Sequence, residues 1–429
     1  MKRRRAGDDE LICSFCGRSS DEVPMLPGPD SNICVDCVKR ANELISVGEA
    51  VKKGGDEPPP LPPTPTPKEI KKFLDQYVIG HDEVKKVLAV AVHNHYRRLE
   101  ATAAARKGKE RKAAPAGYAG YDDVEIEKSN ILLIGPTGCG KTLLAKTLAK
   151  MLGVPFAIGD ATVLTQAGYV GEDVENLVRY LLQNADGDVQ LAQRGIIYVD
   201  EIDKIASKTD NVSITRDVGG EGVQQTLLKI VEGTICRIPP KGGRKHPDQE
   251  YIEVDTSNIL FICGGAFVGL DRIVAARKGR GVVGFGAAER REAEAGAAEV
   301  NPQDVRPEDL VKYGLIPEFT GRLPVITTMK DLSEEDLVRV LTEPKNSLVK
   351  QYRKLLAMDG VSLEFEPAAL KSLAKAALSR GTGARGLRAE MERLMTDIMY
   401  EAPGSDSLRK VTVTAEMVEN PSAAAKAAG

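Results

Sequence analysis

The sequence is poor in the side chains that stack on nucleic-acid bases. Its 429 residues include no tryptophan, and aromatic residues make up only 4% of the chain. Lysine and arginine total 59 against 62 aspartates and glutamates, which gives a formal net charge of −3. A protein that binds the phosphate backbone of a nucleic acid needs a surplus of positive charge, and often aromatic side chains that stack on the bases as well. The composition therefore argues against that class of protein.

Long hydrophobic runs are also missing. The longest candidate, residues 259–270, has 12 residues and contains Gly-Gly, short of the 18 or more that a membrane span requires. The basic start, residues 1–5, is not followed by an apolar stretch, so we do not interpret it as a signal peptide. Seven cysteines without such a signal indicate a reducing compartment, with the cytoplasm as the expected location.

Composition divides the chain into segments. Residues 1–50 hold four of the cysteines, and residues 51–67 contain seven prolines, typical of an extended spacer. Residues 68–322 have the pattern of a large α/β domain, and residues 323–419 read as a smaller, mostly helical domain. The last ten residues, 420–429, are expected to be a disordered tail.

Short apolar runs alternate with helical patterns in the large domain. The runs lie at residues 131–134, 156–158, 196–199, 259–262 and 325–327. Such alternation predicts βαβ units and a parallel sheet with helices on both faces. Two low-complexity stretches, residues 101–123 and 284–307, are expected to be surface loops.

Four cysteines near the start form two C-x2-C pairs separated by 17 residues. Two such pairs can direct four thiolates at one point, which suits a tetrahedral Zn²⁺ site. A redox dithiol or a chance pattern are the alternatives, and the paired spacing favours zinc. Because protein fills every position, the site is expected to be structural. The hydrophobic residues near it are expected to offer a dimer or adaptor surface: Ile33, Val35, Val38 and Leu44. The expected ligands are Cys13, Cys16, Cys34 and Cys37.

A glycine-rich loop follows the first predicted strand of the large domain and precedes a helical pattern. It matches G-x4-G-K-T in the strand–loop–helix context that this motif requires. Its backbone N–H groups can surround phosphate oxygens, while the lysine reaches the β- and γ-phosphates and the threonine binds Mg²⁺. The nucleotide-binding residues are Gly135, Pro136, Thr137, Gly138, Cys139, Gly140, Lys141 and Thr142.

A second motif, residues 196–201, is an apolar strand that ends in two carboxylates. Asp200 is expected to hold Mg²⁺ through water, and Glu201 to polarise the attacking water. With the glycine-rich loop, this pair predicts hydrolysis of a nucleoside triphosphate rather than binding alone.

Three further motifs accompany these two. The first is Tyr77-Val-Ile-Gly80, which His81 follows. The second is residues 317–322, which end in Arg322, and the third is Gly383-Ala-Arg385. With the cysteines, the glycine-rich loop and Asp200-Glu201, they resemble the AAA+ class. Nearly the whole chain, to about residue 419, resembles the Clp family of ATP-driven protein unfoldases, which serve the ClpP peptidase. The resemblance implies ATP, Mg²⁺ and structural Zn²⁺ as cofactors, and a large and a small AAA+ domain at residues 68–322 and 323–419.

The resemblance also implies roles at the nucleotide site. Val78, Ile79 and Gly80 correspond to the adenine-contacting box, although His81 stands where glutamine is frequent. Arg322 corresponds to an arginine finger that completes a neighbouring subunit's site, which implies a ring, in this family a hexamer. Arg385 corresponds to the sensor-2 arginine of the small domain. The fourth predicted strand, which leads into Cys263-Gly-Gly265, lacks a polar residue at the sensor-1 position.

Four loops carry the implied contacts with other proteins. Tyr169 and Val170, between glycines, correspond to the pore loop that grips unfolded substrate, and residues 207–217 to a second pore loop. The basic cluster Arg244, Lys245 and His246 corresponds to a loop that selects tagged substrates. The tripeptide that docks on ClpP corresponds to Val283, Gly284 and Phe285, with valine in place of the usual isoleucine or leucine.

The main prediction is therefore an ATP-dependent unfoldase without a peptidase site of its own. A nucleic-acid motor or loader that reads through the zinc module is the first alternative, against which the charge and the scarce aromatics argue. A zinc scaffold with a decayed nucleotide site is the second. The intact Lys141, Thr142, Asp200 and Glu201 argue against it.

Overall fold

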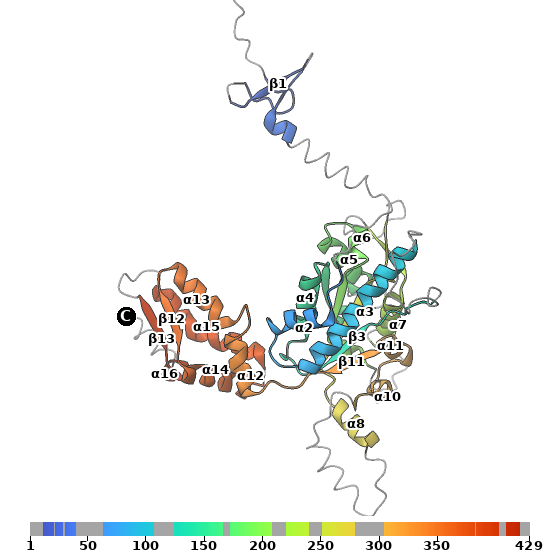
Figure 1. Ribbon diagram of the computed structural model, residues 1–429, viewed down its shortest axis with the longest axis vertical. Helices are drawn as coiled ribbons and strands as arrows, with labels where there is room; N and C mark the ends of the chain where they lie inside the picture. Colours follow the sequence, from blue (N-terminus) through green and yellow to red (C-terminus); the bar gives the residue numbers. More distant parts are fainter. Residues whose placement is uncertain are drawn as a thin grey trace, which may run out of the picture. The chain divides into compact units, whose positions relative to one another are not determined.

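The computed structural model contains two separately packed units (Figure 1). Contacts divide the chain into residues 1–60 and 61–429. The described residues are 12–20, 22–28, 31–39, 63–106, 124–165, 172–207, 220–239, 251–278, 304–381, 383–402 and 409–420.

The first unit is a small module built around a two-stranded antiparallel sheet. Strands β1 (Met25–Pro27) and β2 (Asn32–Cys34) pair with Leu26 opposite Ile33. A bridge between Ile12 and Ser19 closes the preceding turn, and residues 35–39 are helical. Cys13 and Cys16 therefore lie at this turn, whereas Cys34 ends β2 and Cys37 lies in the helical segment that follows.

The second unit contains the parallel sheet that the sequence predicts. All five expected apolar runs form its strands, in the order β11-β3-β10-β7-β4. Every neighbouring pair is parallel. The fold class is therefore confirmed. The strands are β3 (Ile131–Ile134), β4 (Phe156–Asp160), β7 (Ile196–Asp200), β10 (Leu260–Gly265) and β11 (Val325–Thr328).

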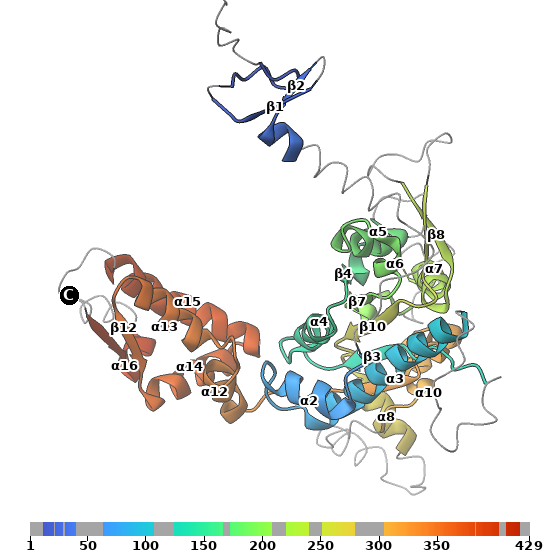
Figure 2. The ribbon, with the colours of Figure 1, turned by 45° about the horizontal axis from the view of Figure 1, so that its top comes forward.

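Helices cover both faces of the sheet, as Figure 2 shows. Side chains alternate along each strand, so Leu133 and Tyr198 face one cluster while Leu132 and Val199 face the other. The first cluster is covered by α2 (Pro67–Asp75), α3 (Asp82–Arg106) and α4 (Lys141–Leu152). The second is covered by α5 (Glu175–Asn184), α6 (Val189–Ala192), α7 (Glu221–Glu232), α8 (Leu270–Lys278), α10 (Pro307–Tyr313) and α11 (Pro317–Gly321).

Short elements connect these layers. The turn after β4 contains η1 (Ala161–Val163) and β5 (Leu164–Thr165), and β6 (Glu172–Asp173) pairs with β5 before α5 begins. A short 3-10 turn, η2 (Ile202–Ile205), follows β7. An antiparallel hairpin joins β8 (Ile235–Ile238) to β9 (Ile252–Asp255).

Two boundaries differ from the sequence-based expectation. Residues 101–106, expected to open a surface loop, continue helix α3, because their run of alanines favours helix more than loop. Strand β11 pairs with β3, so residues 325–328 belong to the large sheet although the expected domain boundary at 322 precedes them. The remainder of both expected loops, residues 107–123 and 284–303, lies outside the described residues.

The C-terminal part has its own core, with buried leucines such as Leu337, Leu373 and Leu394. It consists of α12 (Glu334–Thr342), α13 (Leu348–Met358), β12 (Ser362–Phe365), α14 (Pro367–Ser379), α15 (Ala384–Glu401), β13 (Lys410–Val413) and α16 (Ala415–Glu419). Its two strands pair in parallel. Across the described ranges of both units, no helix is both long and apolar enough to cross a membrane.

Candidate nucleotide site and metal centre

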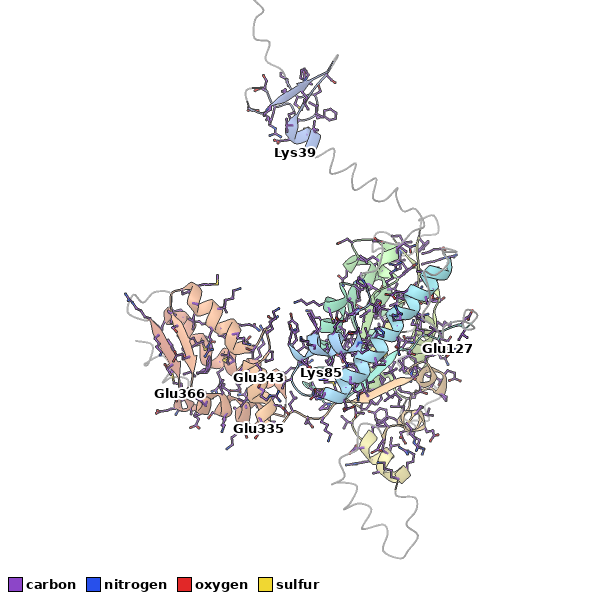
Figure 3. The ribbon with its side chains drawn as sticks, viewed as in Figure 1. Lys39, Lys85, Glu127, Glu335, Glu343 and Glu366 are labelled. Atoms are coloured by element: carbon purple, nitrogen blue, oxygen red, sulfur yellow. The ribbon has the colours of Figure 1, made fainter. Side chains whose placement is uncertain are left out.

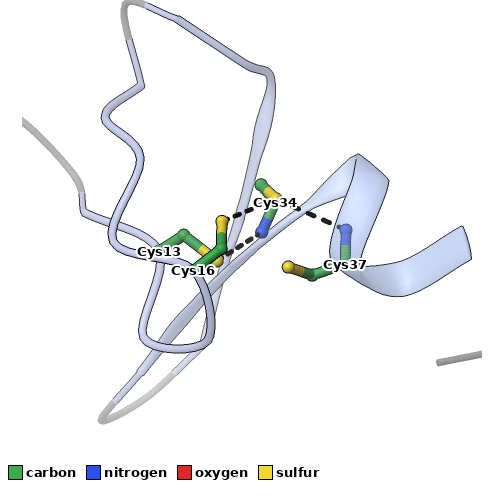
Figure 4. A group of neighbouring side chains, drawn as sticks. All are labelled: Cys13, Cys16, Cys34 and Cys37. Carbon is green, nitrogen blue, oxygen red and sulfur yellow. Dashed lines mark hydrogen bonds between the residues drawn. The ribbon is translucent and has the colours of Figure 1, made fainter. Parts of the chain in front are cut away.

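The four predicted zinc ligands converge on one point (Figure 4). The ligand atoms of Cys13, Cys16, Cys34 and Cys37 all lie within 4.8 Å of one another. The Sγ atoms of Cys16 and Cys34 are 3.6 Å apart. Four sulfurs at about 2.3 Å from a tetrahedral Zn²⁺ would be separated by about 3.8 Å. The spacing therefore fits a metal and is far too long for a disulfide bond of about 2 Å.

Backbone N–H groups prepare these sulfurs for a metal. The N–H of Cys34 donates to the Sγ of Cys13 at 3.3 Å, and the N–H of Cys37 to the Sγ of Cys34 at 3.4 Å. Burial opposes ionisation of Cys13, but such N–H groups prevail and lower its pKa to about 6. The neighbouring thiols Cys34 and Cys16 raise the pKa of Cys37 to about 12. Only a cation at the centre allows all four to be thiolates together.

The glycine-rich loop joins β3 to α4, as predicted. Gly138 and Gly140 have φ values of 84° and 102°, which only glycine adopts without strain, and they turn the loop into the first turn of α4. The Nζ of Lys141 is buried in the loop and donates to the carbonyl oxygens of Gly135 and Pro136 at 2.6 and 3.0 Å. The lysine is thus held inside the loop where phosphates would bind.

Thr142 and Asp200 meet although 58 residues separate them. The hydroxyl of Thr142 donates to Oδ2 of Asp200 at 3.1 Å. Asp200 ends β7 and Thr142 begins α4, so the parallel sheet brings both to the carboxyl end of its strands. A hydroxyl and a carboxylate in contact are the oxygen ligands that Mg²⁺ takes beside a nucleotide. The pair therefore fits the cation that the sequence predicts.

Glu201 lies directly beyond this pair. Its φ of 54° places it in the left-handed region, where a non-glycine residue is strained, and its side chain is exposed. Its N–H donates to Oδ1 of Asp200 at 3.0 Å. The exposed carboxylate is open to solvent, as a base that contacts water requires.

Two residues that the sequence did not single out, one bonded to Asp200 and one at the end of β10, lie near the ends of these strands. The hydroxyl of Tyr198 donates to Oδ1 of Asp200 at 3.1 Å. Burial raises the pKa of Tyr198, so this hydroxyl keeps its proton and donates. Asp203 is also buried and accepts the N–H of Ala266 on Oδ1 at 3.0 Å, which links η2 to the end of β10. The sequence signal that could have identified Tyr198 is its hydroxyl group, the only polar side-chain group in the apolar run that precedes Asp200.

The expected adenine-contacting box packs against the same core as the glycine-rich loop. Val78 and Ile79 are buried, and Val78 shares a cluster with Cys139. Lys85, labelled in Figure 3, donates from α3 to the carbonyl of Val78 and to Oδ1 of Asp75, both at 2.7 Å. Although burial opposes it, this lysine and Lys71 lower the pKa of Asp75. The ion pair between the buried Lys85 and the exposed Asp75 therefore holds the box in place.

The box ends in two left-handed residues, Gly80 and His81, with φ values of 68° and 56°. The His81 ring hydrogen-bonds to the backbone of Cys139, although burial lowers the pKa of His81. The residue that departs from the frequent glutamine thus connects the box to the phosphate-binding loop.

The two predicted arginines lie in different places. Arg385 is exposed in the first turn of α15, and next to it the N–H of Ala384 donates to the carbonyl of Gly138 at 3.3 Å. The sensor-2 motif therefore touches the glycine-rich loop. Arg322 lies at the other end of β3, where its carbonyl accepts from Asn130 and its Nε donates to Glu232 at 2.8 Å.

Several predicted residues lie outside the described part of the chain. They belong to three groups: the pore-loop residues Tyr169 and Val170, the basic cluster Arg244, Lys245 and His246, and the docking tripeptide Val283, Gly284 and Phe285. Most of residues 207–217 is likewise outside it. The elements that flank the basic cluster are β8 and β9, and those that flank Tyr169 are β5 and β6.

Comparison with protein-family models finds three matches. Residues 11–46 match the ClpX C4-type zinc finger, residues 126–326 an AAA domain of the Cdc48 subfamily, and residues 332–415 the C-terminal D2-small domain of the ClpB protein. The first match contains the four clustered cysteines, and the second contains the glycine-rich loop, Asp200 and Glu201. From these three matched domains in this order, the chain is a Clp-type AAA ATPase with the domain architecture of ClpX.

Proposed function

We propose that this protein hydrolyses ATP to unfold tagged proteins and thread them into the ClpP peptidase. The contact between Thr142 and Asp200, with Glu201 beside it, carries the hydrolytic part. Lys141 binds phosphate oxygens, Thr142 and Asp200 hold Mg²⁺, and Glu201 takes the proton of the attacking water. When bound, Mg²⁺ neutralises charge on the phosphates.

The position of Arg322 supports a ring in which subunits complete one another's sites. Arg322 lies near Asn130, before β3, whereas Lys141 lies after it. The four residues of β3 span about 13 Å, more than an arginine side chain can bridge. Its side chain is 55% exposed, so a second copy can receive it. Such a head-to-tail contact closes into a ring, here the proposed homohexamer.

The unfolding activity rests on the resemblance of Tyr169 and Val170 to a pore loop. In the proposal, nucleotide-driven movement of these loops pulls substrate through the channel, while Arg244, Lys245 and His246 select tagged chains. The peptide Val283-Gly284-Phe285 docks on ClpP, and the zinc module binds adaptors or a second copy of itself. The proposed location is the cytoplasm.

The unfolding assay follows a tagged fluorescent protein that loses its fluorescence when unfolded. Purified protein and ATP are expected to abolish the signal without any peptidase. Tyr169→Ala should retain ATPase activity and lose unfolding, because the loop grips substrate without taking part in hydrolysis. Glu201→Gln should bind ATP but turn it over about 10²–10⁴-fold more slowly. Equal unfolding by wild type and Tyr169→Ala would refute the pore-loop role, and a DNA-stimulated ATPase without unfolding would favour the nucleic-acid motor.

A further inference from the structure

The end of β10 has no room for the polar side chain that AAA+ relatives often place there. A Cβ on Gly264 would overlap the hydroxyl oxygen of Tyr198. A Cβ on Gly265 would lie 2.7 Å from Oδ1 of Asp203 and 2.6 Å from the ring of Phe267. These two glycines are therefore required by their neighbours, and polar atoms from β7 and η2 occupy the space instead.

The Tyr198 hydroxyl reaches the nucleotide site from that space. Its ring packs in the core between the sheet and α4, fully buried. Its oxygen donates to Oδ1 of Asp200, while Thr142 donates to Oδ2. With the N–H of Glu201 also on Oδ1, three donors hold the carboxylate from both of its oxygens. Its orientation is therefore fixed before any cation arrives.

A simple structural explanation would be that a buried hydroxyl takes the nearest acceptor. Tyr96 is such a case, because its buried hydroxyl donates to the backbone carbonyl of Arg194 at 3.0 Å. Arg194 precedes β7, at the opposite end of the sheet from Asp200. Tyr198 differs because its acceptor is a side chain that can rotate and that the site needs in one orientation.

We propose that Tyr198 is a positioning residue of the nucleotide site, whose hydroxyl orients Asp200 toward Mg²⁺ in place of a polar side chain on β10. This role rests on the proposed ATP hydrolysis. It makes the interaction of Asp200 with the cation, rather than the binding of the nucleotide itself, sensitive to loss of the Tyr198 hydroxyl.

The test compares Tyr198→Phe with Tyr96→Phe, since each loses one buried hydroxyl. Binding of a fluorescent ATP analogue is measured across a range of Mg²⁺ concentrations and in EDTA, together with ATPase rates and thermal unfolding. Tyr198→Phe is expected to need about 10–100-fold more Mg²⁺ for half-maximal binding, the usual effect of losing a group that orients a metal ligand. Its affinity in EDTA should be unchanged, and Tyr96→Phe should match wild type in nucleotide binding, both across the Mg²⁺ range and in EDTA.

The outcomes separate this role from the proposed function. Wild type that binds no nucleotide would overturn both. Wild type with Mg²⁺-dependent binding, and a Tyr198→Phe curve that coincides with it, would overturn the role of Tyr198 alone. A loss of binding by Tyr198→Phe that is equal in Mg²⁺ and in EDTA would also overturn it, because it would indicate general damage to the site.

Discussion

The junction between the small domain and the glycine-rich loop allows a quantitative prediction. At the start of α15, Gly383 has φ 56° and ψ −140°, a region close to glycine-only backbone space. A Cβ there would lie 3.3 Å from the carbonyl oxygen of Thr137. The next residue, Ala384, donates its N–H to Gly138. The loop that would bind the nucleotide phosphates is thus also in contact with the small domain.

Replacing Gly383 with alanine should weaken ATP binding. Holding alanine in this backbone region costs about 1–3 kcal/mol. The chain can relieve that strain by giving up the contact with the loop. If ATP binding requires the contact, its affinity falls by the same free energy, which corresponds to about 5–150-fold. The dissociation constant of a fluorescent ATP analogue measures this directly.

Gly381 supplies the matched control two residues earlier. It also has a positive φ, 65°, but a Cβ there would meet nothing within 4 Å. Gly381→Ala therefore introduces backbone strain without touching the glycine-rich loop, and its ATP affinity should stay near that of wild type. Equal affinities for all three proteins, or the same loss in both variants, would refute a role for the junction in nucleotide binding.

Two further predictions concern zinc and pH. A strong chelator should remove one Zn²⁺ per chain, counted with a colorimetric indicator. It should unfold only the zinc module within residues 12–39, because residues 61–429 pack separately. Loss of basal ATPase activity together with zinc would contradict this. Burial beside Arg98 and Lys128 lowers the pKa of His95 to about 3, so the unfolded chain binds the extra proton and stability falls as pH drops below about 6.5. Between about pH 6.5 and 4.5 this loss of stability is about 2 kcal/mol. Hydrogen exchange of the α3 amides should show the loss in wild type but not in His95→Phe. Identical pH dependence of the two proteins would contradict it.

The strands and the zinc ligands could be predicted because their signals are local. Each buried strand is a run of apolar residues, and the cysteine pairs and the glycine-rich loop have fixed spacings within a few positions. The parallel sheet then follows from the alternation with helices. The end of α3 could not be placed in this way, because residues 101–106 have the low complexity of a loop but the alanine content of a helix.

The contacts around Asp200 depend on pairings that no local pattern contains. Gly264 and Gly265 suggest from sequence only a missing sensor-1 residue. In the structure, β10 lies beside β7 with Ile262 opposite Tyr198, and this register brings the tyrosine hydroxyl over the glycine two residues further along. The small residue on one strand and the large polar one on its neighbour are thus a single feature. The absence of a polar side chain on β10 therefore does not leave Asp200 without a partner, since Tyr198 on the same strand, β7, already supplies the donor.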